Sequence, residues 1–264
     1  MNKQIGNWFV VCILALGPIS CERSKDSVTL AGSTAFQPFA EKLGELYMNS
    51  HPEVNITVQG GGSAVGVQSA LSGAAQIGMA DLVELPPEAE PLSKATVAKD
   101  GIALVVNPAN PLSNLTMEQI RGIFNGNVKN WKDLGGPDHA ITVVSREAGS
   151  GTRSSFEQII KGIKLTPDAI IQDSNGTIRE TVANDAHAIG YLSHGLLNEK
   201  IKAVDVDGRS CTTEEIMKGD YALVRPIFLL TQGEPEGQTK LFIDFVLSPE
   251  GQQVIQTSGL IPAK

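Results

Sequence analysis

The chain has 264 residues, of which 41% are hydrophobic and 19% charged, and these proportions exclude a disordered protein. Its net charge of −8 leaves no basic excess for a phosphate backbone, and aromatic residues at 5% offer little for base stacking. The composition therefore argues against nucleic acid as a partner, but it does not exclude a small anion, because neutral donors act at contact distance.

The first 21 residues have the pattern of a secretory signal. Lys3 precedes the apolar run 8–16, which is too short to span a bilayer, and a small residue stands before Cys21. This ending is typical of a bacterial lipoprotein, so we expect cleavage before Cys21 and a lipid on that cysteine. The protein would then lie in the periplasm or on the outer face of the cell membrane. Pro18 stands where that motif usually has leucine, which leaves ordinary cleavage near Ser20 as the alternative.

Three strands are each predicted to end in a turn of glycine, serine and threonine that opens a helix. The turns are residues 31–36, 60–66 and 145–153, after strands predicted at 28–30, 54–58 and 141–144 and before helices predicted at 39–47, 67–72 and 154–161. Glycine lets the main chain approach a ligand closely, and a helix N-terminus offers N–H donors and partial positive charge. Convergence of the turns on one ligand predicts a cradle for a small anion, whereas independent turns and helix caps are the alternative.

Two charged residues belong to this predicted cradle. Arg146, in the third turn, carries a planar guanidinium that suits two oxygens of one oxyanion. Asp81 follows the strand predicted at 77–80, and ligands of such sheets lie beyond the carboxyl ends of the strands. We therefore expect Asp81 in the site. The alternatives are that it caps residues 82–84 or lies on the surface.

Strands and helices alternate from residue 28 to 79, which predicts an α/β fold with a largely parallel sheet. After a turn at Asp100-Gly101, a strand at 103–107 is predicted to leave a first lobe, and Pro108 and Pro111 to mark the crossing into a second. Between the crossings we expect helices at 117–124 (capped by Thr116) and 177–183, and a strand at 188–192. Residues 221–230 are the predicted return, because helices predicted at 239–247 and 252–255 need the first lobe to cover their apolar faces. The predicted boundaries are 28–105 and 227–264 for lobe I, 106–226 for lobe II and 1–21 for the signal.

Several motifs resemble those of the phosphate-binding proteins of ABC phosphate importers. In chain order after residue 27 they are GST (32–34), GGGS (60–63), IGMAD (77–81), IRGIFNG (120–126) with NW (130–131), Arg146 with GSGT (149–152), AIGY (188–191) and DFVLSPEG (244–251). The resemblance implies a two-lobed periplasmic-binding-protein fold, type II-like, in which two crossing segments form a hinge. It also implies a monomeric, non-enzymatic receptor that captures inorganic phosphate without a cofactor. Such a receptor delivers phosphate to the membrane permease and ATPase subunits of an importer.

The family's pattern also implies a set of phosphate-binding residues: Ser33, Thr34, Ala35, Ser63, Asp81, Arg146, Ser150, Gly151 and Thr152. N–H and hydroxyl groups would donate to phosphate, and Arg146 would supply the one full positive charge. Asp81 would accept a hydrogen bond from a protonated phosphate oxygen, which sulfate lacks at neutral pH. Ala148 stands where some members carry an acid that pairs with the site arginine, and Glu147 or Glu157 is expected to replace it.

Rival chemistries find less support. The patterns G-x-S-x-G of serine hydrolases, Gly-Lys-Ser/Thr of P-loops and G-x-G-x-x-G of dinucleotide sites are all incomplete here, and the four histidines predict no metal site. A receptor for sulfate or molybdate stays open, opposed only by Asp81. A phosphatase-type enzyme is a weaker alternative, because we find neither an activated nucleophile nor a metal cluster. Cys211 is expected to be a free thiol, with a Cys21–Cys211 disulfide as the alternative.

Overall fold

In the computed structural model, which describes residues 26–263, one sheet of eleven strands runs through the molecule, with a main path β2-β1-β3-β10-β4-β8-β6-β7. At one end β1 (Asp26–Gly32) lies parallel to β2 (Val54–Gln59) and β3 (Ile77–Ala80). At the other end β6 (Thr142–Arg146) lies parallel to β7 (Ile170–Gln172) and β8 (Ala188–Ser193). Within each group the parallel strands end at the same edge of the sheet, so the turns that follow them lie close together at that edge.

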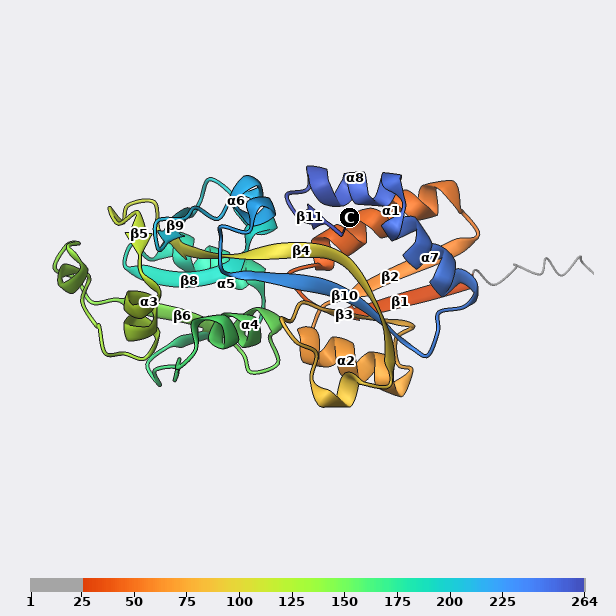
Figure 1. The fold of residues 1–264 in the computed structure, drawn as a ribbon, viewed down its shortest axis with the longest axis horizontal. Coiled ribbons are helices and arrows are strands. Elements are labelled where there is room, and N and C mark those ends of the chain that lie inside the picture. Colours follow the sequence, from red (N-terminus) through yellow and green to blue (C-terminus); the bar gives the residue numbers. More distant parts are fainter. Residues whose placement is uncertain (1–25, 264) are drawn as a thin grey trace, which may run out of the picture.

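Two long antiparallel strands connect these ends. β4 (Leu92–Val106) pairs with β10 (Val224–Gln232) through its first part, and with β8 and β9 (Lys202–Val206) through its last residues. Figure 1 shows β4 in yellow and β10 in blue running side by side from one half of the molecule into the other. Both connections between the halves are therefore strands of the same sheet.

Separate hydrophobic cores define two lobes. Lobe I is built on a cluster that includes Leu30, Leu43, Ile77 and Phe242. Lobe II is built on a cluster that includes Phe124, Trp131, Phe156 and Tyr191. β4 contributes Ala98 to the first core and residues 102–106 to the second. Residues 102–105, predicted with lobe I, thus pack in lobe II, because the strand enters that core before the prolines that follow it.

The helices cover the sheet within each lobe. Lobe I carries α1 (Gln37–Ser50), α2 (Ser63–Ser72), the short η1 (Pro87–Ala89), α7 (Gly237–Leu247), α8 (Pro249–Thr257) and β11 (Ile261–Pro262). In Figure 1, α1, α7 and α8 lie on one face of the lobe I strands and α2 on the other. Lobe II carries β5 (Asn114–Leu115), α3 (Met117–Phe124), η2 (Trp131–Leu134), α4 (Gly151–Ile160), α5 (Asn175–Asn184), η3 (His194–Leu196) and α6 (Thr213–Lys218). As predicted, Thr116 caps α3, in a capping box with Gln119.

The turn predicted at Asp100-Gly101 is wrong, because β4 continues through both residues. Asp100 is buried and lies opposite Arg225 of β10, so its carboxylate has a partner inside the protein. A Cβ on Gly101 would lie 2.6 Å from Ile216 Cδ1 and 2.9 Å from Cys211 Sγ. Glycine here permits close packing of the strand and does not make a turn.

The predicted signal of residues 1–21, with the lipid on Cys21, lies outside the described residues. From residue 26 to 263, no helix is both long enough and apolar enough to cross a membrane. Cys211 is buried and forms no disulfide within the described residues, and Cys21, its alternative partner, lies outside them.

Candidate functional site

The three turns rich in glycine, serine and threonine lie together where the strand ends of the two lobes face each other. Gly62 N–H donates to Gly32 O at 2.9 Å and joins the first turn to the second. Ala64 N–H donates to Gly149 O at 3.1 Å and joins the second turn, in lobe I, to the third, in lobe II. Gly32 has φ 132°, and a Cβ there would clash with the carbonyl oxygen of Met79. Only glycine permits this approach of the main chain.

Helix α4 begins at this junction. Its N-cap Ser150 accepts a hydrogen bond from Arg153 N–H at 3.3 Å, while the N–H groups of Gly151 and Thr152 in the first turn have no intrahelical acceptor. A Cβ on Gly151 would clash with Ser63 Oγ and lie 2.8 Å from Asp81 Oδ1. The start of α4 is thus in close contact with lobe I, and its N–H groups favour an anion.

Arg146, the last residue of β6, is 1% exposed and held from two sides. Glu147 accepts from its Nε at 2.9 Å and its Nη2 at 2.8 Å, and the carbonyl oxygens of Gln172 and Asp173 accept at 3.3 and 3.2 Å. Arg146 Nη1 has no hydrogen-bond partner among the described residues. Buried polar atoms are rarely left unpaired, so Nη1 is a charged donor that suits an anionic ligand.

Glu147 takes the place of the acid that some members of the family carry at position 148. Its bidentate contact with Arg146 has the geometry of a fork meeting a carboxylate. Glu157, the other candidate, instead accepts from Arg153 Nε at 2.7 Å. In this structure Glu147 is therefore the acid that holds Arg146.

Asp81 follows β3 directly and is 2% exposed, which contradicts the alternative of a surface position. Ser63 Oγ donates to its Oδ1 at 2.6 Å, and Arg225 Nη1 lies 2.5 Å from its Oδ2. Thr152 Oγ1, from lobe II, donates to Oδ2 at 3.3 Å. The hydroxyl hydrogens of Ser63 and Thr152 are therefore already donated to Asp81. Their main-chain N–H groups, in the first turns of α2 and α4, remain as donors.

The hydroxyls of Ser33, Thr34 and Ser150 differ from these two, because within the described residues they accept hydrogen bonds and donate none. The donors are Phe36 N–H at 3.0 Å, Asn175 Nδ2 at 3.1 Å and Arg153 N–H at 3.3 Å, respectively. A hydroxyl that accepts keeps its own hydrogen for another acceptor. These three side chains can thus donate to a ligand, while Ala35, also buried, can offer only its main-chain N–H.

Arg225 was missed by the sequence prediction, which expected Arg146 to carry the one full positive charge. It is a second buried arginine, paired with Asp81 at 2.5 Å and with Asp100 at 2.9 Å. A lone arginine within the apolar stretch 221–230 was the available signal, since arginine is almost never fully buried without a partner. Burial raises the pKa of Asp100, while the charge and hydrogen bond of Arg225 act to lower it.

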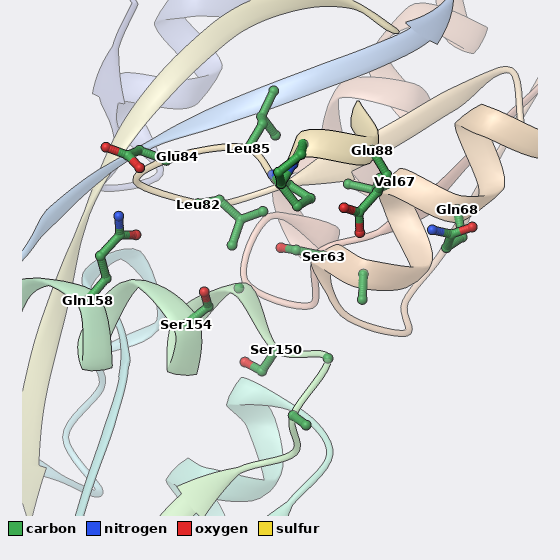
Figure 2. Close-up of a pocket in the computed structure, with 16 residues that line it drawn as sticks. Ser63, Val67, Gln68, Leu82, Glu84, Leu85, Glu88, Ser150, Ser154 and Gln158 are labelled. Atoms are coloured by element: carbon green, nitrogen blue, oxygen red, sulfur yellow. The ribbon is translucent and has the colours of Figure 1, made fainter. Parts of the chain in front are cut away.

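A cleft of about 380 Å³ opens beside these residues, between α2 of lobe I and α4 of lobe II. Figure 2 shows Ser63 on one wall, Ser150, Ser154 and Gln158 on the other, and Leu82, Glu84 and Leu85 on the loop after β3. Ser63, Ser150 and Gly151 line the cleft, whereas Arg146 does not. Neither Arg146 nor Asp81 lines the cleft, and the charged side chains that do line it are Glu84 and Glu88.

Taken as chemistry, the junction offers N–H and O–H donors, one guanidinium nitrogen and one buried carboxylate. That set suits a small oxyanion with a protonated oxygen, which can donate a hydrogen bond to the carboxylate. In residues 26–263, no three His, Cys, Asp or Glu side chains are grouped so as to hold a metal ion.

Comparison with known proteins agrees with this chemistry. A family model described as PBP superfamily domain matches residues 21–250. The chain is 35% identical to the phosphate-binding protein PstS of Bacillus subtilis (strain 168), over 91% of this chain and 82% of that protein. The chain belongs to the phosphate-binding proteins of the PBP superfamily. This confirms the family that the motifs predicted.

Solved structures of the phosphate-binding family have the same fold. A phosphate ABC transporter substrate-binding protein from Clostridium perfringens, with bound phosphate, is 38% identical with a TM-score of 0.88, covering 90% of this chain and all of that one (100%). An ABC-type phosphate transport receptor from Vibrio cholerae is 37% identical with a TM-score of 0.75, covering 89% of this chain and 99% of that one. The predicted two-lobed periplasmic-binding-protein fold is confirmed.

Proposed function

We propose that this protein captures inorganic phosphate between its two lobes and delivers it to an ABC importer. The observation that carries the proposal is Arg146 Nη1, a buried charged donor without a partner among the described residues, at the junction of three glycine-rich turns. The family supports the same ligand, since the relative from Clostridium perfringens is described with bound phosphate.

Each predicted residue then has a role that its contacts allow. Phosphate accepts from Arg146 Nη1 and from the hydroxyls of Ser33, Thr34 and Ser150. Main-chain N–H groups donate as well, from Ala35, Ser63, Gly151 and Thr152. Asp81 accepts a hydrogen bond from the protonated oxygen that phosphate carries at neutral pH. Every donor is neutral except Arg146. Because these donors act at contact distance, the net charge of −8 does not prevent an anion from binding.

Binding of sulfate or molybdate is a weaker proposal, because neither carries a proton for Asp81 at neutral pH. A phosphatase activity is weaker still, since Ser63, the hydroxyl closest to a carboxylate, donates to Asp81 at 2.6 Å and sits beside no histidine base. The relative from Bacillus subtilis is named as a phosphate-binding protein, and the one from Vibrio cholerae as a phosphate transport receptor. We therefore propose a receptor without catalytic activity.

Delivery requires the lobes to open, and we place the hinge where β4 and β10 cross between them. In the proposed cycle, the monomeric receptor closes on phosphate and docks on the membrane permease of the importer, whose ATPase subunits drive release. The location is extracytoplasmic, and a lipid on Cys21 would hold the protein at the outer face of the membrane.

Isothermal titration calorimetry of the protein with phosphate tests the proposal. One phosphate should bind per chain, and Arg146→Gln should weaken binding by at least about tenfold, the usual cost of losing a charged hydrogen bond. Arg209→Gln is the matched control, because Arg209 is also in lobe II but pairs with Glu215 and Asp220 at the surface. It should bind phosphate as the parent does. Absence of heat from the parent at millimolar phosphate would contradict the proposal.

A further inference from the structure

A chain of buried polar contacts starts at Asp81 and runs through both crossing strands. Arg225 of β10 reaches Asp81 Oδ2 with Nη1 at 2.5 Å and Asp100 Oδ2 with Nη2 at 2.9 Å. On the far side, Ser193 Oγ donates to Asp100 Oδ1 at 2.9 Å. The three charged side chains are at most 2% exposed, so these contacts are shielded from bulk solvent.

This chain of contacts lies where the two strands cross between the lobes. Arg225 and Asp100 face each other in the register of β10 and β4, at the level where the chain passes from one core to the other. Ser193 N–H in turn donates to Asn175 Oδ1 at 3.0 Å, and Asn175 Nδ2 donates to Thr34 at 3.1 Å. The contacts thus lead from one predicted ligand residue in lobe I, through lobe II, to another.

Arg225 is the charged partner of Asp81. The groups facing Asp81 are Ser63 of α2, Thr152 and Ser155 of α4 and Arg225 of β10, with Asp100 of β4 behind the arginine. Of these, only Arg225 and Asp100 carry charge, and the charge of Asp100 has the same sign as that of Asp81. A buried carboxylate is strongly disfavoured without a cation beside it, so the place of Asp81 in the site depends on Arg225. Without Arg225, the carboxylate of Asp81 would not be held where it is proposed to accept a hydrogen bond from the ligand.

We propose that Arg225 is a positioning residue for ligand specificity, which holds the Asp81 carboxylate in place as a hydrogen-bond acceptor so that only an oxyanion carrying a proton is accepted. This inference rests on the proposed phosphate function. It assigns the preference for phosphate over sulfate to a pair of residues, of which Arg225 itself does not touch the ligand. Because Arg225 acts through Asp81, its loss should change the ratio of the two affinities more than the affinity for phosphate.

The test measures sulfate and phosphate binding by calorimetry at neutral pH for the parent, Arg225→Gln and Arg225→Lys. Sulfate is the informative probe, because it carries no proton at that pH. In Arg225→Gln the phosphate-to-sulfate ratio should fall by at least about tenfold, the cost of one unsatisfied charged contact. Arg225→Lys restores the cation and should restore most of the ratio, whereas a loss of ratio caused only by damage to the fold would not be repaired by it.

A combined variant keeps the test decisive where Arg225→Gln does not fold. Arg225 also pairs with the buried Asp100, so all three charges are removed together, as Asp81→Asn, Asp100→Asn and Arg225→Gln. Where Asp81 is already an amide, Arg225 has no carboxylate to position, and the combined variant should have the same phosphate-to-sulfate ratio as Asp81→Asn alone. A further change of about fivefold or more in that ratio would overturn the inference.

The remaining outcomes separate this inference from the proposed function. If the parent binds phosphate and rejects sulfate, but Arg225→Gln keeps the parent's phosphate-to-sulfate ratio, Arg225 does not set specificity and only this inference falls. If the parent binds no phosphate at all, both fall together.

Discussion

Glu147 accepts two hydrogen bonds from Arg146, its immediate neighbour in the chain, at 2.8 Å from Nη2 and 2.9 Å from Nε. Adjacent residues of a strand point to opposite faces, and here the pair meets because β6 ends at Arg146 and the chain turns. The contact fixes the plane of the guanidinium. The third nitrogen, Nη1, is thereby presented in one direction.

Glu147→Gln should lower the free energy of unfolding in the absence of phosphate by roughly 1–2 kcal/mol, because a buried arginine loses its carboxylate while Glu147 itself is about a third exposed (31%). Glu157→Gln is the matched control. It breaks a pair with Arg153, whose side chain is 23% exposed, and should cost less. Urea denaturation of the three proteins makes the comparison. Equal losses in the two variants would mean that Glu147 is not the acid that holds Arg146.

Asp81→Asn should let sulfate bind measurably and narrow the phosphate-to-sulfate ratio by at least about tenfold, since the carboxylate that opposes sulfate becomes an amide that can donate. Part of the charge of Asp81 is balanced by Arg225, so the change should be smaller than for an unpaired carboxylate. Competition between the two anions, followed by calorimetry, measures the ratio. A variant that still rejects sulfate as the parent does would remove Asp81 as the discriminator.

Gly151→Ala should weaken phosphate binding by about tenfold or more, because the new methyl clashes with Ser63 Oγ and crowds Asp81 Oδ1 where α4 meets lobe I. Gly149→Ala, two residues away, is the control. Its Cβ would meet only the Cβ of Ala64, at an ordinary 3.5 Å, and we expect little change. Phosphate titrations of both variants decide the matter. Similar affinities for the two would show that the lobes need not approach this closely to hold the ligand.

The protein should lose stability between about pH 10 and pH 12 through Tyr191. Burial raises the pKa of Tyr191 from 10.0 to about 12, although its hydrogen bond with Ser145 lowers it in part. The folded state therefore holds this proton more tightly than the unfolded state, so the stabilisation is complete below pH 10 and is lost as pH rises to 12. For one group the loss is roughly 2–3 kcal/mol.

Tyr191→Phe should flatten the fall in unfolding free energy over this range, as measured by urea denaturation at a series of pH values. The slope should not vanish, because burial also raises the pKa of Tyr221 and of Cys211. An unchanged slope in Tyr191→Phe would contradict the assignment to this tyrosine.

The parts of the fold that the sequence predicted are those with short-range causes. Glycine and serine at 31–36 and 145–153 force turns within a few residues, and the helix capped by Thr116 begins and ends as its spacing indicated. Arg225 escaped prediction because its partners lie 144 and 125 positions away, and no local pattern connects them. The wrong prediction of a turn at Asp100-Gly101 has the same cause. An aspartate followed by glycine is typical of a turn, and only the distant partner Arg225 explains why this aspartate is buried in a strand. Short elements such as α6 and β7 carry too few residues for a period to be seen.

The continuity of β4 across both lobes has a mechanical consequence. A pair of hydrogen-bonded strands resists bending within its own plane and bends more readily across it. The pairing of β4 with β10 also has one irregularity in register, between Ile227 and Phe228, close to the crossing. About the proposed hinge, these strands would favour rotation around a single axis. The two binding edges would then return to the same alignment on each closure, without the entropy that two independent flexible linkers would lose on every capture of ligand.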